Sequence, residues 1–144
     1  MQIREILTLK SDTIHSIAPT DTVESAVGKL VGLGVGSLVV MKGGEMVGLL
    51  TERDVVKGMA TQGCDLKDAE VGSVMVTDPV VASADDSLDY ARDVMTKSKI
   101  GHLPILDGDR LLGIISFHDV ARACLKEANF ENSLLKRYIK HWPE

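Results

Sequence analysis

The apolar positions of residues 21–34 predict an amphipathic helix. They recur at steps of three and four, the spacing of one helix face, at Val23, Ala26, Val27, Leu30 and Val31. Asp21-Thr22-Val23-Glu24 offers a capping residue followed three positions later by an acid, which marks a helix start. Gly34 is expected to end the helix.

The pattern then changes to that of a β-hairpin and a second helix. Residues 37–41 and 46–50 are short β-rich runs, and the turn Lys42-Gly43-Gly44-Glu45 separates them. A second helix is expected from near Thr51, and a short strand near residues 14–17 precedes the whole. The predicted unit has the order β-α-β-β-α.

The same pattern returns 65 positions later. It predicts a strand near residues 80–83, a helix over 87–97, strands over 103–106 and 111–115, and a helix over 116–127. The repeat is clearest in one seven-residue stretch. At the same offset of 65, it reads Gly48-Leu49-Leu50-Thr51-Glu52-Arg53-Asp54 in the first copy and Gly113-Ile114-Ile115-Ser116-Phe117-His118-Asp119 in the second. A constant offset without gaps indicates duplication of a whole folding unit. We predict repeats over residues 1–65 and 66–128, an α/β class, and a shared core, since about 60 residues alone bury too little surface.

Composition limits the class of protein. The chain has 144 residues, of which 44% are hydrophobic and 26% charged, as in ordinary globular proteins. Its net charge of -5 argues against a general surface for nucleic acid or anionic membranes. No apolar run approaches the roughly 20 residues that span a bilayer, and no signal-peptide stretch follows Met1. We therefore expect a cytoplasmic protein without nucleic-acid or membrane partners.

Neither metal nor catalytic chemistry finds support in the sequence. Cys64 and Cys124 lie near no second cysteine and at no zinc-finger spacing from a histidine, which favours idle or buried thiols. No nucleophile with a separate base is discernible, and neither phosphate-binding glycine motif is present. We expect no metal, no catalytic residue and no catalytic cofactor.

The repeated motif carries the candidate chemistry. Thr51 and Asp54, like Ser116 and Asp119, stand where a strand meets a helix, and a helix start suits an anionic group such as phosphate. A carboxylate accepts two hydrogen bonds, as many as vicinal ribose hydroxyls donate. Basic residues follow both junctions, at Arg53 with Lys57 and at His118 with Arg122. The alternative is that Thr-x-x-Asp only caps the helix, but capping does not require the basic partners.

Three further features leave alternatives open. His102 is a candidate phosphate ligand or a structural histidine, and its counterpart Ser37 cannot neutralise charge; Pro104 implies an edge position or a strand end. Gly28 and Gly32, inside the first helix, are either tolerated or allow close approach of another helix. The segment 129–144 predicts a C-terminal amphipathic helix, which packs back on its own module or docks on a second subunit or an effector. Its apolar face comprises Phe130, Leu134, Leu135, Tyr138, Ile139 and Trp142.

On these residues the chain resembles a tandem pair of cystathionine-beta-synthase (CBS) domains, a Bateman module. The resemblance covers roughly residues 5–128, and its closest likeness is to small stand-alone prokaryotic CBS-pair proteins. It implies two β-α-β-β-α repeats packed about a pseudo-twofold axis, a flat homodimer, and two clefts for adenosyl ligands (AMP, ADP, ATP, NAD or S-adenosylmethionine). Relatives often have a basic residue at the position of Gly101, which makes AMP or NAD the favoured ligand here.

The resemblance also implies roles for individual residues. Asp54 and Asp119 would hold ribose, Thr51 and Ser116 would face ribose or phosphate, and Arg53, His118 and His102 would lie near phosphate. The remaining candidates would line the adenine pockets: Val35, Gly36, Ser37, Leu38, Thr13 and Ile14 in one copy, and Ile100, Gly101, Leu103, Pro104, Asp78, Pro79 and Val80 in the other.

The resulting prediction is a non-enzymatic adenine-nucleotide sensor that acts as a homodimer on an unknown effector protein. Two rivals remain: an assembly module with vestigial clefts, and an unrecognised nucleotide-processing enzyme.

Overall fold

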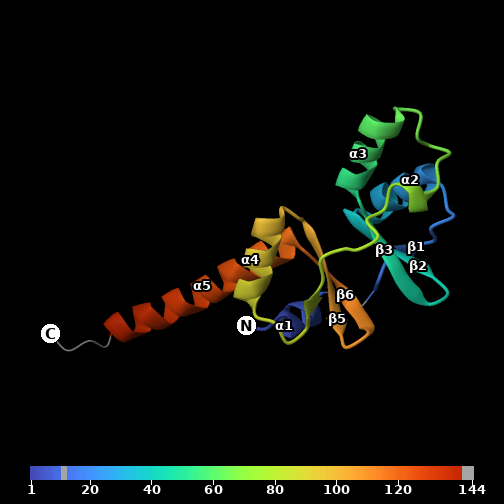
Figure 1. Cartoon of the computed structure of the whole chain (residues 1–144). Helices are drawn as coiled ribbons and strands as arrows, with labels where there is room; N and C mark the ends of the chain where they lie inside the picture. Colours follow the sequence, from blue (N-terminus) through green and yellow to red (C-terminus); the bar gives the residue numbers. More distant parts are fainter. Residues whose placement is uncertain (11–12, 141–144) are drawn as a thin grey trace. The chain divides into compact units, whose positions relative to one another are not determined.

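A computed structural model describes residues 1–10 and 13–140 (Figure 1), with side chains described as far as Arg137. The chain forms two compact units. One, the first-copy unit, is Thr13–Val81; the other, the second-copy unit, combines Met1–Asp12 with Ala82–Glu144. Each unit holds a three-stranded sheet with helices, so the predicted α/β class is confirmed.

The first-copy unit follows the predicted element order closely. Its sheet has the order β1-β2-β3, with β1 parallel to β2 and β2 antiparallel to β3. Its elements are β1 (Ser16–Ile17), α2 (Val23–Leu33), β2 (Ser37–Lys42), β3 (Glu45–Thr51), α3 (Glu52–Gln62) and the 3₁₀ helix η1 (Val71–Ser73).

Local chemistry explains the ends of α2. The N-cap is Thr22, one residue later than Asp21, and its side chain accepts a hydrogen bond from the Ser25 N–H at 3.1 Å. Asp21 instead accepts from the Ala18 N–H at 3.0 Å. Gly34 ends the helix as predicted, at a φ of 65° that favours glycine. Apart from the chain neighbours and the backbone of α2 itself, no described heavy atom lies within 4 Å of where a Cβ at Gly28 or Gly32 would stand.

The second-copy unit repeats this arrangement. Its sheet has the order β4-β5-β6 with the same parallel and antiparallel pairings. Its elements are α1 (Ile3–Thr8), β4 (Ala82–Ser83), α4 (Leu88–Ser98), β5 (His102–Asp107), β6 (Arg110–Ser116) and α5 (Phe117–Lys140).

Each unit is completed by the segment that precedes the other unit's sheet in the chain, and this division differs from repeats cut at residue 65. In the first-copy unit, the Val71 N–H donates to Asp21 O at 2.8 Å and the Gly72 N–H to Pro19 O at 2.9 Å. In the second-copy unit, the Ile3 N–H donates to Asp86 O and the Arg4 N–H to Ala84 O, both at 2.9 Å. Residues 3–7 therefore have the same place in the second-copy unit as residues 71–75 have in the first-copy unit. These two segments are 68 positions apart, whereas the rest of the repeat is offset by 65.

Pro104 lies in β5, the middle strand, instead of at an edge. The neighbouring strand β4 begins opposite Ile105, so Pro104 lies just outside that pairing. At the equivalent position of the first copy, the Val39 N–H donates to His15 O at 3.0 Å. Proline has no N–H to donate, and the position tolerates it because this part of β5 lacks the β4 ladder.

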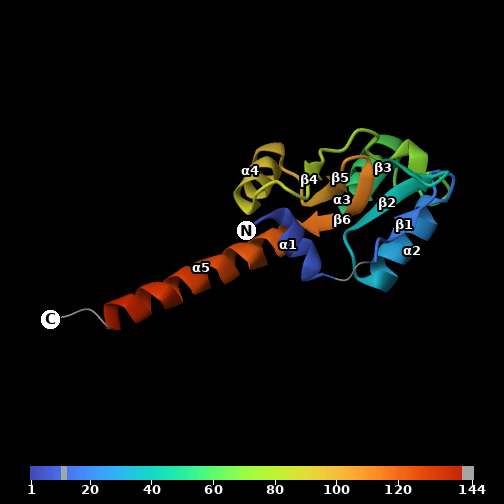
Figure 2. The same ribbon diagram turned by 90° about the horizontal axis from the view of Figure 1, so that it is seen from below.

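Two helices were predicted after β6, over residues 116–127 and 129–144. The structure has one continuous helix, α5, in their place. It runs from Phe117 to Lys140, and Figure 2 shows it in orange to red, continuing beyond α1 and α4. Val120 and Ala123 in its first turns are buried, whereas Phe130, Leu134 and Leu135 are 64%, 48% and 56% exposed. These three side chains do not pack back on the module. The side chains of Tyr138 and Ile139, and all of Trp142, lie outside the described residues.

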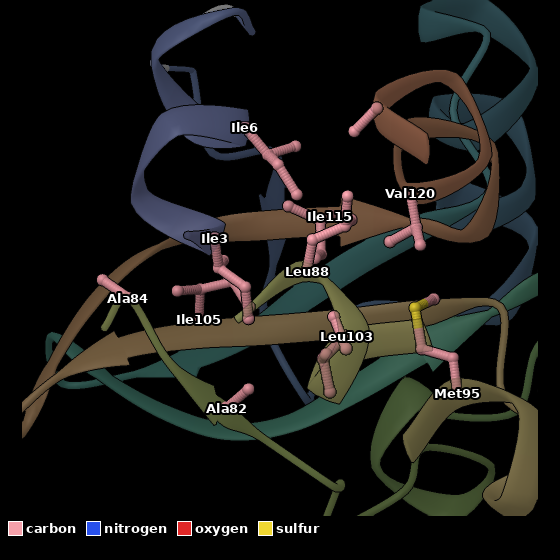
Figure 3. Close-up of a cluster of buried hydrophobic side chains, with 12 residues drawn as sticks. Ile3, Ile6, Ala82, Ala84, Leu88, Met95, Leu103, Ile105, Ile115 and Val120 are labelled. Carbon is pink, nitrogen blue, oxygen red and sulfur yellow. The ribbon is translucent and has the colours of Figure 1, made fainter. Parts of the chain in front are cut away.

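Each unit has its own hydrophobic core. In the second-copy unit, Figure 3 shows side chains from α1, α4, β5, β6 and α5 converging between the helices and the sheet. Ile3 and Ile6 of α1 are 0% and 2% exposed, which anchors the N-terminal segment here. Cys124 packs against this core, as expected for a packing position, whereas Cys64 is exposed.

Candidate functional site

The first-copy site forms where β3 ends and α3 begins. The Thr51 N–H and hydroxyl both donate to Asp54 Oδ2, each at 2.9 Å, and the Asp54 N–H donates to Thr51 Oγ1 at 3.3 Å. This reciprocal arrangement is a capping box. Asp54 is 8% exposed, and Ser37, paired with Thr51 across the sheet, is 9% exposed. The sequence therefore folds the hydroxyl and the carboxylate into one fixed corner.

The second-copy site has the same frame at the junction of β6 and α5. The Ser116 N–H donates to Asp119 Oδ2 at 2.8 Å, and the Asp119 N–H donates to Ser116 Oγ at 3.1 Å. His102 pairs with Ser116 across the sheet, as Ser37 pairs with Thr51. The predicted pairing of hydroxyl, carboxylate and strand residue is thus present twice.

One residue that the sequence analysis missed distinguishes the two corners. Lys10 Nζ donates to Asp119 Oδ2 at 2.6 Å and to Ile114 O at 2.7 Å. Burial acts to raise the pKa of Asp119, but the hydrogen bonds from Lys10 and Ser116 and the charge of Lys10 outweigh it. The pKa of Asp119 therefore lies below its ordinary value. No lysine or arginine among the described residues forms an ion pair with Asp54.

The basic residues after each junction are exposed. Arg53 and Lys57 lie on the solvent side of α3. Arg122 donates to His118 Nε2 at 2.9 Å, which makes this ring nitrogen the acceptor because a guanidinium has only donors. His118 and Arg122 thus form a local pair on the surface of α5.

The candidates at the start of the central strands have matched positions. Val35 and Gly36 precede β2, and Ile100 and Gly101 precede β5. The Glu52 N–H donates to Gly36 O at 3.1 Å, and the Phe117 N–H donates to Gly101 O at 2.7 Å. Leu38 and Leu103 belong to the two cores, and Pro104 is buried but is not part of either core cluster.

The candidates before the first strand of each copy divide unequally between the units. Thr13 and Ile14 precede β1, and the parallel register Ser16 to Val39 brings this segment alongside the start of β2. Asp78, Pro79 and Val80 fall in the first-copy unit, so their role at the second-copy site stays a prediction.

Close packing explains why the repeated motif begins with a glycine in both copies. A Cβ at Gly48 would lie 2.7 Å from Val76 O and 2.8 Å from Met75 Sδ. A Cβ at Gly113 would lie 3.2 Å from Leu7 Cδ2. Met75 and Val76 thus lie against β3 at Gly48, and Leu7 lies against β6 at Gly113, which holds each of these segments beside its motif.

A cavity of about 370 Å³ lies between α2 and α3 in the first-copy unit and includes neither Thr51 nor Asp54. Val35 and Gly36 belong to its lining, which otherwise consists of Val27, Leu30, Val31, Gly34, Glu52 and Val55. A second cavity of about 240 Å³ shares Val27 and Val55 with it. This groove is largely apolar and lies apart from the carboxylate corner.

No cluster of three or more metal-ligating side chains occurs among residues 1–10 and 13–140. Within the part of the chain that the structure describes, no helix is long and apolar enough to cross a membrane.

Comparison with known sequences identifies the family. The fold and the doubled motif are those of a CBS-domain pair, and the family model for the CBS domain matches residues 3–61 and 71–126. The chain belongs to the CBS-domain family.

Relatives of this family resemble the chain over most of its length. It is 33% identical over 125 residues to the CBS domain-containing protein CBSX3, mitochondrial, of Arabidopsis thaliana, covering 83% of this chain and 61% of that protein. Its fold matches the CBS-domain protein ATU1752 of Agrobacterium tumefaciens with a TM-score of 0.82 and 30% identity, over 85% of this chain and 98% of that one. It also matches CBSX2 in complex with AMP, with a TM-score of 0.72 and 22% identity, over 88% of this chain and 98% of that one.

Proposed function

We propose that this CBS pair is a non-enzymatic regulatory module that binds an adenosyl ligand, AMP or NAD in preference, and acts as a homodimer on an effector protein. The observation that carries this proposal is the buried or half-buried carboxylate at the start of α3 and again at the start of α5. Each is held by hydrogen bonds from its own strand end. Both corners share the hydrogen bonds between backbone N–H, hydroxyl and carboxylate at the helix start, although only one carries the lysine.

The geometry of the carboxylates suits a ribose. The Thr51 N–H and hydroxyl both use Asp54 Oδ2, and the Ser116 N–H uses Asp119 Oδ2. A carboxylate offers about four lone-pair directions, so acceptor capacity remains for two ribose hydroxyls. Because the backbone fixes the carboxylate beforehand, little ordering entropy would be lost on binding.

The surroundings suit a phosphate of low charge better than a polyphosphate. Arg53 follows one helix start, His118 follows the other, and His102 pairs with Ser116 across the sheet. Gly101, which precedes His102, offers no cation. This distribution supports AMP or NAD more than ATP.

The comparisons support the ligand class. CBSX2, which shares the fold, is a complex with AMP. CBSX3 and ATU1752 are CBS domain-containing proteins. A regulatory role without chemistry of its own is the reading that fits these relatives.

The homodimer rests on the exposed face of α2. Val27 and Val31 are 38% and 77% exposed and border the apolar groove, and Gly28 and Gly32 lie beside them with no described neighbour within 4 Å. The equivalent face of α4 carries Arg92, Asp93, Thr96 and Lys97. An apolar, glycine-bearing face in only one copy fits a second subunit, since each glycine inside a helix costs about 1 kcal/mol.

One observation favours a rival function. Thr51 and Asp54 already satisfy one another in the capping box, which alone accounts for both residues. In this rival, the module is a ligand-free assembly unit and the motif is purely structural.

Binding experiments separate the two functions. The purified chain is screened with AMP, ADP, ATP, NAD, NADH and S-adenosylmethionine by thermal shift, and each hit is titrated by calorimetry. We expect AMP or NAD to raise the melting temperature and to give heat at millimolar concentration or below. A screen in which no compound does so contradicts the sensor and favours the assembly module.

A turnover assay tests the second rival. The protein is incubated with ATP and with NAD, and the nucleotides are followed by chromatography. We expect both to remain intact; conversion of either would make the protein an enzyme.

A further inference from the structure

Asp54 and Asp119 differ in the side chains that donate hydrogen bonds to their carboxylates. Asp54 accepts two hydrogen bonds on Oδ2, both from Thr51. Asp119 accepts hydrogen bonds from Ser116 and, in addition, one on Oδ2 from the Lys10 ammonium at 2.6 Å. The Lys10 and Asp119 side chains are 33% and 16% exposed, so water screens this ion pair only in part.

This difference between Asp54 and Asp119 arises from the segment that lies along the outer edge of the motif strand in each unit. In the first-copy unit, Leu49 O accepts from the Val76 N–H and the Leu49 N–H donates to Val76 O, both at 2.9 Å, so backbone closes the outer edge of β3. In the second-copy unit, Ile114 has the place of Leu49, and its carbonyl accepts from Lys10 Nζ at 2.7 Å. A side chain has replaced the backbone at this edge, and it brings a positive charge with it.

The difference in length between the two segments explains this replacement. Ile17 lies ten positions after Leu7, which packs against Gly113, whereas Ala82 lies seven positions after Met75, which packs against Gly48. By the offset of 68 that relates these segments, the counterpart of Lys10 is Asp78, which carries the opposite charge. The sequence offset of 65 aligns Lys10 with Met75 and hides this exchange.

A cation on Asp119 opposes the binding of a neutral diol. Ribose hydroxyls would have to exchange a charge-assisted hydrogen bond for neutral ones, and charge-assisted bonds are roughly twice as strong. The Lys10 ammonium would then need a new partner or water. Asp54 imposes no such exchange, because Thr51 is its only described side-chain partner.

We propose that Lys10 is an internal competitor for ribose at Asp119 and makes the second-copy site the weaker of the two. This inference rests on the proposed function, since it concerns the same adenosyl ligand. It determines which site fills first: Asp54 binds at low ligand concentration, and Asp119 binds only when ligand displaces Lys10. Ile3 and Ile6 remain buried in the core, so the displacement is confined to the Lys10 side chain and its neighbours.

The test measures the second-copy site alone, in the full chain carrying Asp54→Asn, by calorimetry with AMP and with adenosine. In this background Lys10→Met keeps most of the aliphatic stem and removes the charge. We expect it to tighten the binding of both ligands about three- to tenfold. Lys10→Arg keeps a cation, and Lys126→Met removes an exposed lysine elsewhere in the unit; both should stay within about twofold of the parent.

A second readout does not depend on affinity. The Nζ signal of Lys10, followed by ¹⁵N NMR, should move on addition of AMP as the ion pair with Asp119 breaks. In the same samples, Lys10→Met should raise the pKa of Asp119, measured from its carboxyl ¹³C signal.

The outcomes discriminate between the inference and the function. Unchanged binding in Lys10→Met, or weaker binding of AMP, overturns the competitor, and the latter would make Lys10 a phosphate ligand. Loss of AMP binding in the wild-type chain as well overturns the proposed function itself. Binding at Asp54 without any gain in Lys10→Met overturns the inference alone.

Discussion

At the scale of single residues, the duplicated motif uses the same frame with different neighbours. Thr51 with Asp54, and Ser116 with Asp119, make matching hydrogen bonds at their helix starts. The sequence predicted these pairs because hydroxyl and carboxylate sit three positions apart. It did not predict Lys10, because an ion pair between residues 109 positions apart leaves no local pattern. The only available signal was the unmatched lysine just before Thr13.

The lowered pKa of Asp119 predicts how its contribution to stability depends on pH. The folded state binds this proton less readily than the unfolded state, so the contribution is complete above the unfolded pKa of about 3.9. It declines as the pH falls through the folded value. We expect the free energy of unfolding of wild type to exceed that of Asp119→Asn by more at pH 7 than at pH 3, in urea titrations.

Asp109→Asn, in the exposed turn between β5 and β6, controls for the loss of one negative charge. A wild-type advantage over Asp119→Asn that is the same at both pH values would show that the ion pair with Lys10 contributes nothing.

Replacing each motif glycine with alanine should lower the free energy of unfolding by unequal amounts. Gly48→Ala would place its Cβ against the backbone oxygen of Val76, which cannot move alone, and should cost about 1–3 kcal/mol of unfolding free energy. Gly113→Ala meets the flexible end of Leu7 and should cost less. Denaturant titration measures both. Gly101→Ala, with nothing within 4 Å, is the control, and a loss at Gly101 as large as at Gly48 would refute the packing explanation.

At the scale of elements, the hydrophobic pattern predicted most of the helices and strands. The hairpins of both copies and the starts of α3 and α4 lie within a residue or two of their predicted places. The prediction that one helix ends and another begins near residue 128 was wrong. Helix α5 is continuous there because Ala128-Asn129-Phe130 contains no helix breaker. The sequence pattern also placed Pro104 at an edge or a strand end, since sequence does not reveal that β4 is only two residues long.

The exposed face of α2 predicts the effect of a charge on self-association. Val31, 77% exposed beside the apolar groove, should be buried against a second subunit if that face forms the homodimer. Val31→Glu would then bury an unpaired carboxylate, and we expect the dimer dissociation constant to rise at least about tenfold. Analytical ultracentrifugation over a concentration series measures it.

Tyr90→Glu, on α4 of the other unit and 47% exposed, provides the matched control. A Val31→Glu protein that dimerises as tightly as wild type would exclude the α2 face from the interface.

At the scale of the whole molecule, two CBS copies form two units that are not cut where the sequence repeat suggests. The N-terminal segment Met1–Asp12 completes the unit of the second copy. Local patterns do not reveal this, because the other buried residues of the core that holds Ile3 and Ile6 lie at least 76 positions away in the chain. The doubled motif was nonetheless sufficient to indicate the family, which the match over residues 3–61 and 71–126 shows.

The central claim is that Asp54 and Asp119 bind an adenosyl ligand, and a double variant tests it most directly. Asp54→Asn with Asp119→Asn keeps a side-chain oxygen at each helix start but removes both charges, and circular dichroism verifies that the fold persists. Calorimetry with AMP compares it with wild type. We predict a loss of affinity of roughly tenfold to a hundredfold, since each charge-assisted hydrogen bond contributes about 1.5–3 kcal/mol. Wild-type affinity in a folded double variant would contradict the claim and leave the two carboxylates as helix caps.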